Sequence, residues 1–211
     1  MLSASEANRR YFEAAYRTGI HGWGVEAPSE YAVASLDALT ASIPGGTVLD
    51  IGCGEGRHAI AAAAMGFRVT AIDYEPLAIQ RARWFAKAAG AKGITFRRAS
   101  VFELPFKASA FDAVLDYGCL HHQRKRDWPT YQANILRALK PRGFYILSVF
   151  SPRFRLFRAG TQHWHVAQGA YRRCFTRQDL DDFLGGDFDI ITMSEEKGDR
   201  GGFWHLLVQR I

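Results

Sequence analysis

Val48-Leu-Asp-Ile-Gly-Cys-Gly-Glu-Gly56 is the stretch that decides the fold of this 211-residue chain. An apolar run ends on Asp50, glycines follow at alternate positions, and an Ala-rich segment comes next. This order predicts a strand, a tight turn and the start of a helix. Glycine permits positive φ and lets a ligand approach the backbone closely, and a helix start offers unpaired N–H groups and a partial positive charge. We therefore expect a nucleotide-like ligand across this turn.

The spacing of the glycines indicates which ligand. Turns that bind dinucleotides have the pattern G-x-G-x-x-G, whereas this turn has G-x-G-x-G, with Arg57 where the third glycine of that pattern would stand. The carboxylate of Asp50 would repel a pyrophosphate but could accept hydrogen bonds from an ammonium group. The expected ligand has an amino-acid end and a nucleoside end, as S-adenosylmethionine does, and an oxidoreductase is disfavoured.

At this point the chain resembles the class I S-adenosylmethionine-dependent methyltransferases, whose first motif is an acid followed by G-x-G-x-G. The resemblance extends over residues 47–150. Asp73 ends a second apolar run, 17 residues past Gly56, and an acid at the end of the second strand of a βαβ unit can bind both ribose hydroxyls. By resemblance, the cofactor-binding residues are Asp50, Gly52, Cys53, Gly54, Gly56 and Asp73, with S-adenosylhomocysteine as the product.

Further along the family pattern, Ser100 stands where an acid often holds the adenine amino group. Serine can still form a hydrogen bond, and a backbone contact from Val101 or Phe102 is expected beside it. A short, mostly apolar run from Phe111 ends on the acid Asp116. In the family, the corresponding strand borders the transferable methyl group. The resemblance adds these residues to the cofactor site: Tyr74, Ser100, Val101, Phe102, Asp116, Tyr117 and, as a lid, Trp23. For Asp116 the alternative is that it only hydrogen-bonds the turn after its strand.

The remaining pattern predicts an α/β fold. We expect helices at 5–18, 28–42, 57–65, 76–89, 128–139 and 176–184, and strands at 47–51, 67–73, 93–99, 111–116, 143–150, 187–196 and 203–210. Alternating strands and helices imply a parallel sheet. With the resemblance, this is a Rossmann-like doubly wound seven-stranded sheet, mostly parallel with an antiparallel C-terminal strand and helices on both faces. We expect one methyltransferase domain, with a helical cap or lid (1–45), a cofactor-binding core (46–150) and a substrate-side loop and C-terminal hairpin (151–211).

Candidate acceptor-site residues lie on loops at the carboxyl ends of the expected strands, where open α/β sheets bind ligands. Methyl transfer mainly requires alignment of the reactants, and a base is needed only where the acceptor must lose a proton. The predicted catalytic residues are Tyr117, His121 and His122, and the predicted substrate residues are Tyr16, Trp23, His121, His163, His165 and Tyr171. The alternative for His121 and His122 is that they only close the turn after the strand. No third ligand accompanies His163 and His165, so no metal site is expected.

Composition limits the class of protein further. Three cysteines without metal-ligand spacing suggest a reducing cytoplasm, and no apolar run is long enough to cross a membrane. The net charge is +6, but the basic residues look scattered, so we expect neither a nucleic-acid partner nor a membrane partner. The oligomeric state and the acceptor atom are not specified by the sequence.

The acceptor class follows from a missing motif. Enzymes of this family that methylate nucleic-acid amino groups carry an Asn/Asp-Pro-Pro-aromatic motif, whereas this chain has Asp116-Tyr-Gly-Cys119. Residues 104–106 and 174–180 are similar to small-molecule enzymes of the tellurite-resistance, thiopurine and quinone-pathway types. We predict a small-molecule methyltransferase. The alternatives are an RNA or protein methyltransferase, favoured by the positive charge, and a non-catalytic S-adenosylmethionine-binding module.

Overall fold

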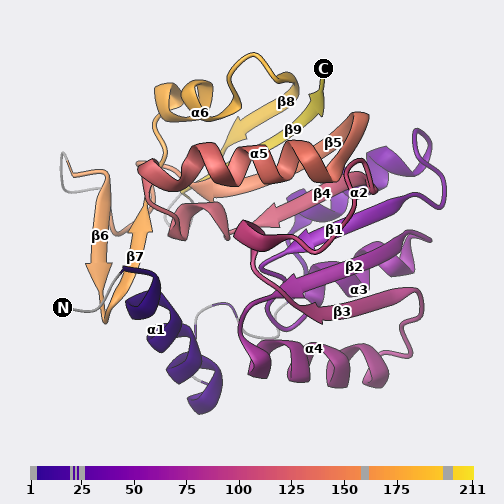
Figure 1. Ribbon diagram of the computed structural model, residues 1–211, viewed down its shortest axis with the longest axis horizontal. Helices are drawn as coiled ribbons and strands as arrows, with labels where there is room; N and C mark the ends of the chain where they lie inside the picture. Colours follow the sequence, from indigo (N-terminus) through magenta and orange to yellow (C-terminus); the bar gives the residue numbers. More distant parts are fainter. Residues whose placement is uncertain (1–3, 20, 22, 24–26, 158–161, 197–201) are drawn as a thin grey trace.

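A seven-stranded sheet forms the centre of the computed structural model, which describes residues 4–19, 21, 23, 27–157, 162–196 and 202–211 (Figure 1). The strand order is β3-β2-β1-β4-β5-β9-β8. The first five strands pair in parallel, and β9 pairs antiparallel with both β5 and β8. The predicted fold class is therefore confirmed. The strands are β1 (Thr47–Ile51), β2 (Arg68–Asp73), β3 (Ile94–Arg98), β4 (Phe111–Tyr117), β5 (Leu139–Phe150), β8 (Phe188–Glu195) and β9 (Phe203–Arg210).

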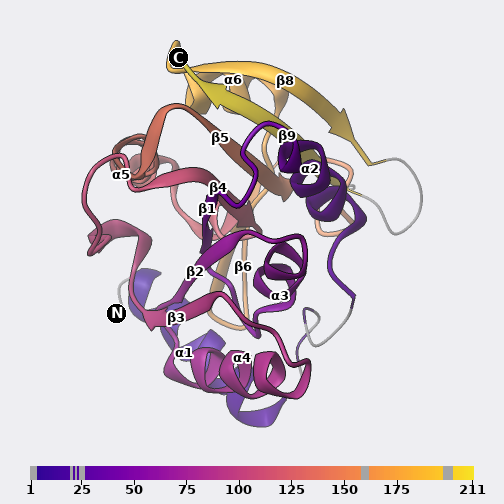
Figure 2. The same cartoon turned by 90° about the vertical axis from the view of Figure 1, so that its right-hand side faces the viewer.

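Helices cover both faces of the sheet (Figure 2). One face packs against α5 (Trp128–Ala138) and α6 (Arg177–Leu184). The other packs against α2 (Glu30–Thr40), α3 (Arg57–Ala64) and α4 (Pro76–Ala88). Because both faces are buried, the central strands are nearly continuous apolar runs.

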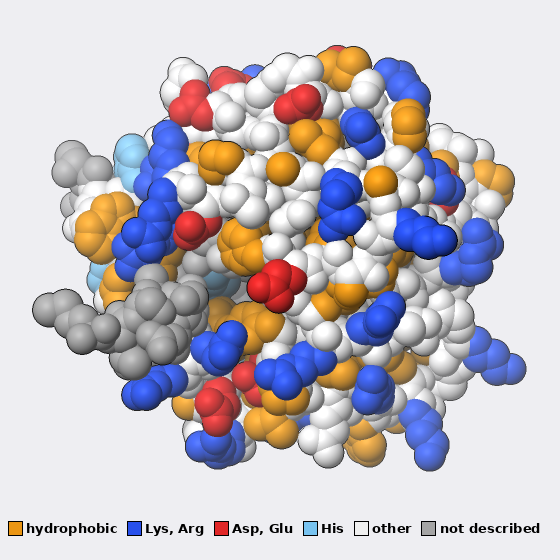
Figure 3. Space-filling view, in the orientation of Figure 1, with side chains coloured by type: hydrophobic (Ala, Val, Ile, Leu, Met, Phe, Trp, Pro, Cys, Tyr) orange, Lys and Arg blue, Asp and Glu red, His pale blue; other side chains and the backbone are white. Residues whose placement is uncertain are grey.

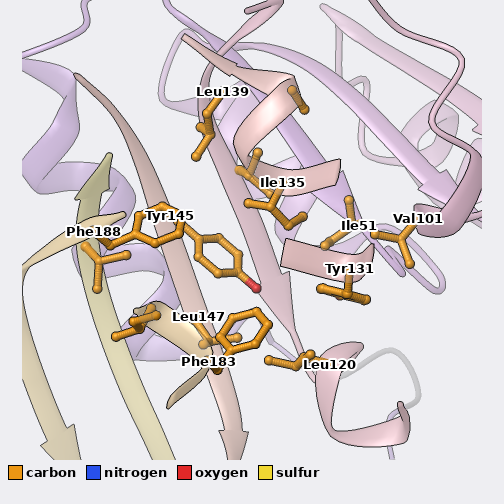
Figure 4. Packing of buried hydrophobic residues seen from close by; sticks show 14 of the residues in the cluster. Ile51, Val101, Leu120, Tyr131, Ile135, Leu139, Tyr145, Leu147, Phe183 and Phe188 are labelled. Carbon is orange, nitrogen blue, oxygen red and sulfur yellow. The ribbon is translucent and has the colours of Figure 1, made fainter. Parts of the chain in front are cut away.

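The face of the sheet that packs against α5 shows how the apolar spacing in the sequence produces a hydrophobic core. Tyr131 and Ile135 lie four residues apart on one face of α5 and are fully buried. They pack with side chains of the sheet and of α6, among them Tyr145 and Phe183 (Figure 4). The start of α6 has a capping box, in which Thr176 and Asp179 each accept a hydrogen bond from the other's backbone N–H. This helix begins where the sequence indicates.

The carboxyl ends of the parallel strands point toward α1 (Ala4–Thr18) and a small hairpin made of β6 (Trp164–Ala167) and β7 (Ala170–Arg173) (Figure 1). The substrate-side loop expected between residue 150 and the helix at 176–184 is not only a loop, because β6 and β7 pair antiparallel within it as a separate two-stranded sheet. Gln168 and Gly169 have φ of 52° and 84° at the turn, and two positive φ values suit a tight hairpin. Gln-Gly is a weaker signal for such a turn than Asn-Gly.

Other differences are smaller. Strand β5 begins at Leu139, four residues before the prediction, and three 3₁₀ turns, η1 (Val101–Glu103), η2 (Leu120–His122) and η3 (Lys125–Asp127), lie where none is expected. The β8–β9 hairpin is confirmed. Residues 197–201, between its two strands, lie outside the described residues, as do residues 20, 22 and 24–26 next to the predicted lid residue Trp23. The subdivision at residues 45 and 150 stays a prediction. None of the described helices has the length and hydropathy needed to cross a bilayer.

Candidate functional site

The glycine turn joins β1 to α3 in a conformation that only glycine adopts easily. Gly52, Gly54 and Gly56 have φ of 64°, 55° and 85°, in the left-handed region that disfavours residues with a Cβ. Space is also limited. A Cβ on Gly52 would lie 2.9 Å from the Cβ of Cys119, and one on Gly54 would lie 2.9 Å from the hydroxyl of Tyr16. The turn is therefore a bare-backbone cradle.

Asp50, at the end of β1, leaves one carboxylate oxygen unused. The side chain is buried, and Oδ2 has no hydrogen-bond partner among the described residues. Burial, together with the nearby charges of Asp116 and Asp73, raises the pKa of Asp50 to about 8, against the opposing effects of the Arg57 charge and the Ala59 backbone N–H. A buried carboxylate of this kind is stabilised by a directly bonded cation. It fits the ammonium group of an amino-acid ligand.

Asp73 connects the end of β2 to the glycine turn. Its Oδ2 accepts a hydrogen bond from the Gly54 N–H at 3.0 Å, and its Oδ1 accepts one from the Glu75 N–H at 2.9 Å. Burial raises the pKa of Asp73 to about 6, against these hydrogen bonds. Each carboxylate oxygen can accept a second bond. The neighbouring Tyr74 hydroxyl is buried without a partner in the described part of the chain. These groups fit a ligand that carries hydroxyls.

The helix α1 covers this turn. The hydroxyl of Tyr16 accepts a hydrogen bond from Nε1 of Trp23 at 3.0 Å, and it lies against Gly54. The Asn8 side chain donates to the carbonyl of His122 at 3.0 Å and accepts from the Tyr171 N–H at 2.7 Å. Tyr16 therefore lies against the cofactor turn, with Trp23 bonded to it, and the substrate role of both residues stays a prediction.

Asp116, at the end of β4, has no oxygen to spare. Oδ1 accepts from the N–H groups of Cys119 (2.9 Å) and Leu120 (3.3 Å), and Oδ2 accepts from the hydroxyls of Tyr131 and Tyr145, both at 2.8 Å. The side chain is fully buried, and burial raises its pKa to about 6. This geometry corresponds to the alternative in which Asp116 secures the turn after its strand, not to a cofactor contact.

The two predicted catalytic histidines differ in which nitrogen is available. His121 stacks on Phe150 with ring centroids 3.6 Å apart, and its Nδ1 accepts from the Phe150 N–H at 3.3 Å, so its proton is on Nε2. His122 is the reverse, because Nδ1 lies 2.9 Å from the Tyr171 carbonyl and must donate to it, which leaves a lone pair on Nε2. Burial lowers both pKa values, that of His122 to about 4. Both rings are neutral at pH 7.

An aromatic cluster lies beside these histidines at the ends of β4, β5 and β9. Tyr117 and Phe203 stack with centroids 5.6 Å apart, and Phe150 stacks on Phe154 at 3.9 Å. We call Tyr117, His121, Phe150, Phe154 and Phe203 the acceptor-side cluster. Its three phenylalanines were not among the predicted site residues, although Phe150 ends a predicted strand, Phe154 follows that strand and Phe203 starts the last one.

Other predicted residues lie apart from this cluster. His163 and His165 are exposed, next to or within β6, and no group of three metal-binding side chains occurs among the described residues. Ser100 is half-buried and its hydroxyl accepts from the Phe102 N–H at 3.2 Å, which caps η1. Tyr171 is buried and orients His122 through its backbone.

Two residues next to the turn were also missed. The guanidinium of Arg57 lies 5.5 Å from the ring centre of Tyr117, and the His58 ring lies 4.8 Å from the same ring. His58 accepts from the Ser29 N–H at 3.1 Å, and burial lowers its pKa to about 3. Their signal was their position directly after Gly56, at the start of α3. Together they connect the glycine turn to the acceptor-side cluster.

Comparison with known proteins agrees with this geometry. A family model described as a methyltransferase domain matches residues 48–143. The chain is 33% identical over 105 residues to the 2-heptyl-1-hydroxyquinolin-4(1H)-one methyltransferase of Mycobacteroides abscessus, covering 50% of this chain and 46% of that protein. It is 43% identical over 75 residues to a ubiquinone biosynthesis O-methyltransferase of Methylocella silvestris, covering 36% and 29%. The chain thus matches about half the length of these curated relatives, or less.

A solved structure is similar over nearly the whole fold. The 1,6-didemethyltoxoflavin-N1-methyltransferase of Burkholderia thailandensis, with bound 1,6-didemethyltoxoflavin and S-adenosylhomocysteine, aligns with a TM-score of 0.77 and 26% identity, over 100% of this chain and 91% of that one. The matched residues and the fold support a class I S-adenosylmethionine-dependent methyltransferase. The cofactor of this family is S-adenosylmethionine.

Proposed function

We propose that this chain transfers a methyl group from S-adenosylmethionine to a small-molecule acceptor by in-line displacement. The observation that carries the proposal is the buried Oδ2 of Asp50, which has no hydrogen-bond partner in the described part of the chain and lies beside a bare glycine turn. The bound cofactor supplies a methyl group on a sulfonium. The protein binds it, orients the acceptor and excludes water.

Different residues would bind different parts of the cofactor. Asp50 would accept hydrogen bonds from the ammonium group, and Asp73 would accept them from the ribose hydroxyls while still holding the Gly54 N–H. The turn, the adenine side and the lid complete the site with Gly52, Cys53, Gly56, Tyr74, Ser100, Val101, Phe102, Tyr16 and Trp23. Asp116 is left out because its four hydrogen bonds occupy it.

The acceptor we propose is a planar aromatic or heteroaromatic molecule. The acceptor-side cluster offers flat ring faces, and such rings favour offset stacking with other aromatic rings. Two proteins similar to this chain are named for a hydroxyquinolinone and a didemethyltoxoflavin acceptor. Where the acceptor must lose a proton, we propose that Nε2 of His122 takes it, because Nδ1 donates to the Tyr171 carbonyl and Nε2 then carries the lone pair. Asn8 holds the backbone of His122. Arg57 and Tyr117 would border the methyl group.

The state of the three cysteines supports a cellular compartment for this protein. Cys53, Cys119 and Cys174 are all unpaired thiols, and unpaired thiols are typical of a reducing compartment. We propose a cytoplasmic enzyme.

Calorimetric titration with S-adenosylmethionine, S-adenosylhomocysteine and NAD tests the cofactor. We expect micromolar binding of the two adenosyl compounds, about −8 kcal/mol, and none of NAD; binding of NAD alone would overturn the assignment. A screen of hydroxylated and N–H heteroaromatic acceptors then tests transfer by the appearance of S-adenosylhomocysteine. Tight cofactor binding without turnover on any acceptor class would point to the non-catalytic alternative, and turnover on RNA alone to the nucleic-acid alternative.

A further inference from the structure

The positive charge of this chain is concentrated in one segment. The chain has 27 Lys and Arg against 21 Asp and Glu. Residues 76–102 hold six of the cations and no acid, so the rest of the chain carries 21 charges of each sign and is neutral overall. The six are Arg81, Arg83, Lys87, Lys92, Arg97 and Arg98. The whole net charge of +6 thus comes from α4, β3 and the connection between them.

These cations form one edge of the molecule. Strand β3 is the edge strand of the sheet, and α4 lies beside it at the outer boundary of the fold in both ribbon views (Figures 1 and 2). All but Arg81 are exposed. Arg83 donates to the Phe96 carbonyl of β3 at 2.9 Å, which joins the helix to the strand. Figure 3 shows the blue side chains over this lower part of the molecule, interspersed with hydrophobic ones.

Trp84 stands out within this edge. It is 64% exposed, the most exposed large hydrophobic side chain among the described residues, and it has Arg83 and Lys87 on either side along α4. Exposing an indole costs hydrophobic free energy, so the position suggests a partner. Tryptophan flanked by Lys and Arg is the combination that suits the headgroup region of a bilayer, since the ring is amphipathic and the cations attract anionic lipids.

We propose that the edge formed by α4 and β3 docks on the surface of an anionic phospholipid bilayer, with Trp84 at headgroup level. A single-stranded nucleic acid fits less well, because such sites stack successive bases on several aromatic rings, whereas the other aromatic residues of this segment, Phe85, Phe96 and Phe102, are at least partly buried. That no helix among the described residues could span a membrane does not bear on peripheral docking. The net charge of the whole chain conceals how strongly the charge is concentrated at this edge. The proposal does not depend on the methyl acceptor.

Vesicle co-sedimentation of the full chain tests the proposal, with phosphatidylcholine vesicles that either contain or lack phosphatidylglycerol. We expect binding only to the anionic vesicles, weakening as salt rises. The double variant Lys87→Glu/Lys92→Glu should lower the partition coefficient at least about 30-fold, since each basic residue contributes about a fivefold gain near an anionic surface. Trp84→Ala should also weaken binding and remove the blue shift of emission that the vesicles induce.

Matched control variants show whether vesicle binding depends on this edge or only on the net charge of the protein. Lys107→Glu/Arg126→Glu makes the same change in net charge at exposed positions outside the segment, and Trp164→Ala removes the other strongly exposed tryptophan, 46% exposed on β6. Both should bind vesicles as the parent does. Equal binding to both vesicle types, equal losses in the control variants, or Trp84-dependent binding to polyuridylate with none to vesicles would each overturn the proposal. Cofactor affinity in solution reports whether each variant is folded.

Discussion

Two neighbouring strands each carry a buried aspartate near their carboxyl end, and the two side chains differ in how far their hydrogen-bonding capacity is satisfied. Strands β1 and β4 pair in parallel, with Asp50 opposite Leu115 and Asp116 opposite Ile51. Asp116 accepts four hydrogen bonds from its own chain, whereas Asp50 keeps an oxygen without any partner in the described residues. Burial raises both pKa values, to about 8 for Asp50 and about 6 for Asp116.

This difference in hydrogen bonding indicates which of the two aspartates stabilises the fold and which is available to bind a ligand. A satisfied buried acid contributes to the fold, because its hydrogen bonds offset the cost of desolvation. An unsatisfied one costs stability until a ligand arrives. We therefore interpret the β4 end as scaffold and the β1 end as a site, although both carry an aspartate at nearly the same level of the sheet.

Asp116→Ala should have the largest effect. It removes a buried carboxylate and leaves the hydroxyls of Tyr131 and Tyr145 unpaired, so we expect a loss of about 3–5 kcal/mol in the free energy of unfolding. Urea denaturation measures this loss. The exposed Asp189→Ala is the control and should change stability by less than about 0.5 kcal/mol. A small effect at Asp116 would remove the basis for calling the β4 end scaffold.

Asp50→Asn should act on binding instead. Loss of the charged acceptor should weaken S-adenosylhomocysteine by about 2–3 kcal/mol, a 30- to 150-fold change in Kd by calorimetry. The same variant should be no less stable than the parent without ligand, because it removes a desolvated acid. Undiminished affinity, or a fall in melting temperature like that of Asp116→Ala, contradicts this prediction.

The raised pKa of Asp50 makes binding depend on pH. Below about 8 the free carboxyl is mostly protonated, and pairing with an ammonium group requires the proton to leave. Affinity for S-adenosylhomocysteine should therefore increase from pH 6 to 8, by up to about tenfold per pH unit. Titrations in buffers of different ionisation enthalpy measure the released proton, and the slope should vanish in Asp50→Asn.

The same raised pKa has the opposite consequence for the unliganded fold. In the folded state Asp50 holds its proton up to about pH 8, whereas in the unfolded chain it loses the proton near pH 4. The contribution of this group to stability is thus full below about pH 4 and falls as the pH rises toward 8. Urea midpoints of parent and Asp50→Asn, compared across this interval, should diverge as the pH rises; parallel curves would argue against the assigned pKa.

Tyr131→Phe gives the smallest effect. It deletes one of the four hydrogen bonds to Asp116 and leaves the other three, so we expect a loss of about 1 kcal/mol in unfolding free energy. Tyr145→Phe should behave alike, and the double variant should lose more than the sum because Oδ2 of Asp116 is then unsatisfied. Simple additivity would mean that the two hydroxyls act independently.

The sequence indicates Asp50 and Asp73 as site residues because each acid lies at the end of an apolar strand and their motif is local; their roles stay predictions. It does not predict that Asp116 is saturated, since that depends on Tyr131 and Tyr145, 15 and 29 residues further along the chain. The β6–β7 hairpin was missed because Gln168-Gly169 is a weak turn signal, and the acceptor-side phenylalanines because they meet only in the folded sheet. The positive charge of residues 76–102 can be counted from the sequence, but the net charge of the whole chain does not show that it is concentrated there.

The position of α1 has a consequence for kinetics. Tyr16 lies on the glycine turn, and Asn8 fastens the helix to His122 and Tyr171. If the product binds between the turn and this helix, as the proposed site implies, it leaves only when the helix lifts, and its dissociation rate then equals the opening rate of α1. We expect turnover to be limited by that step rather than by methyl transfer. A looser attachment, as in Asn8→Ala, would then make the enzyme faster at saturating substrate while its affinity for the cofactor falls.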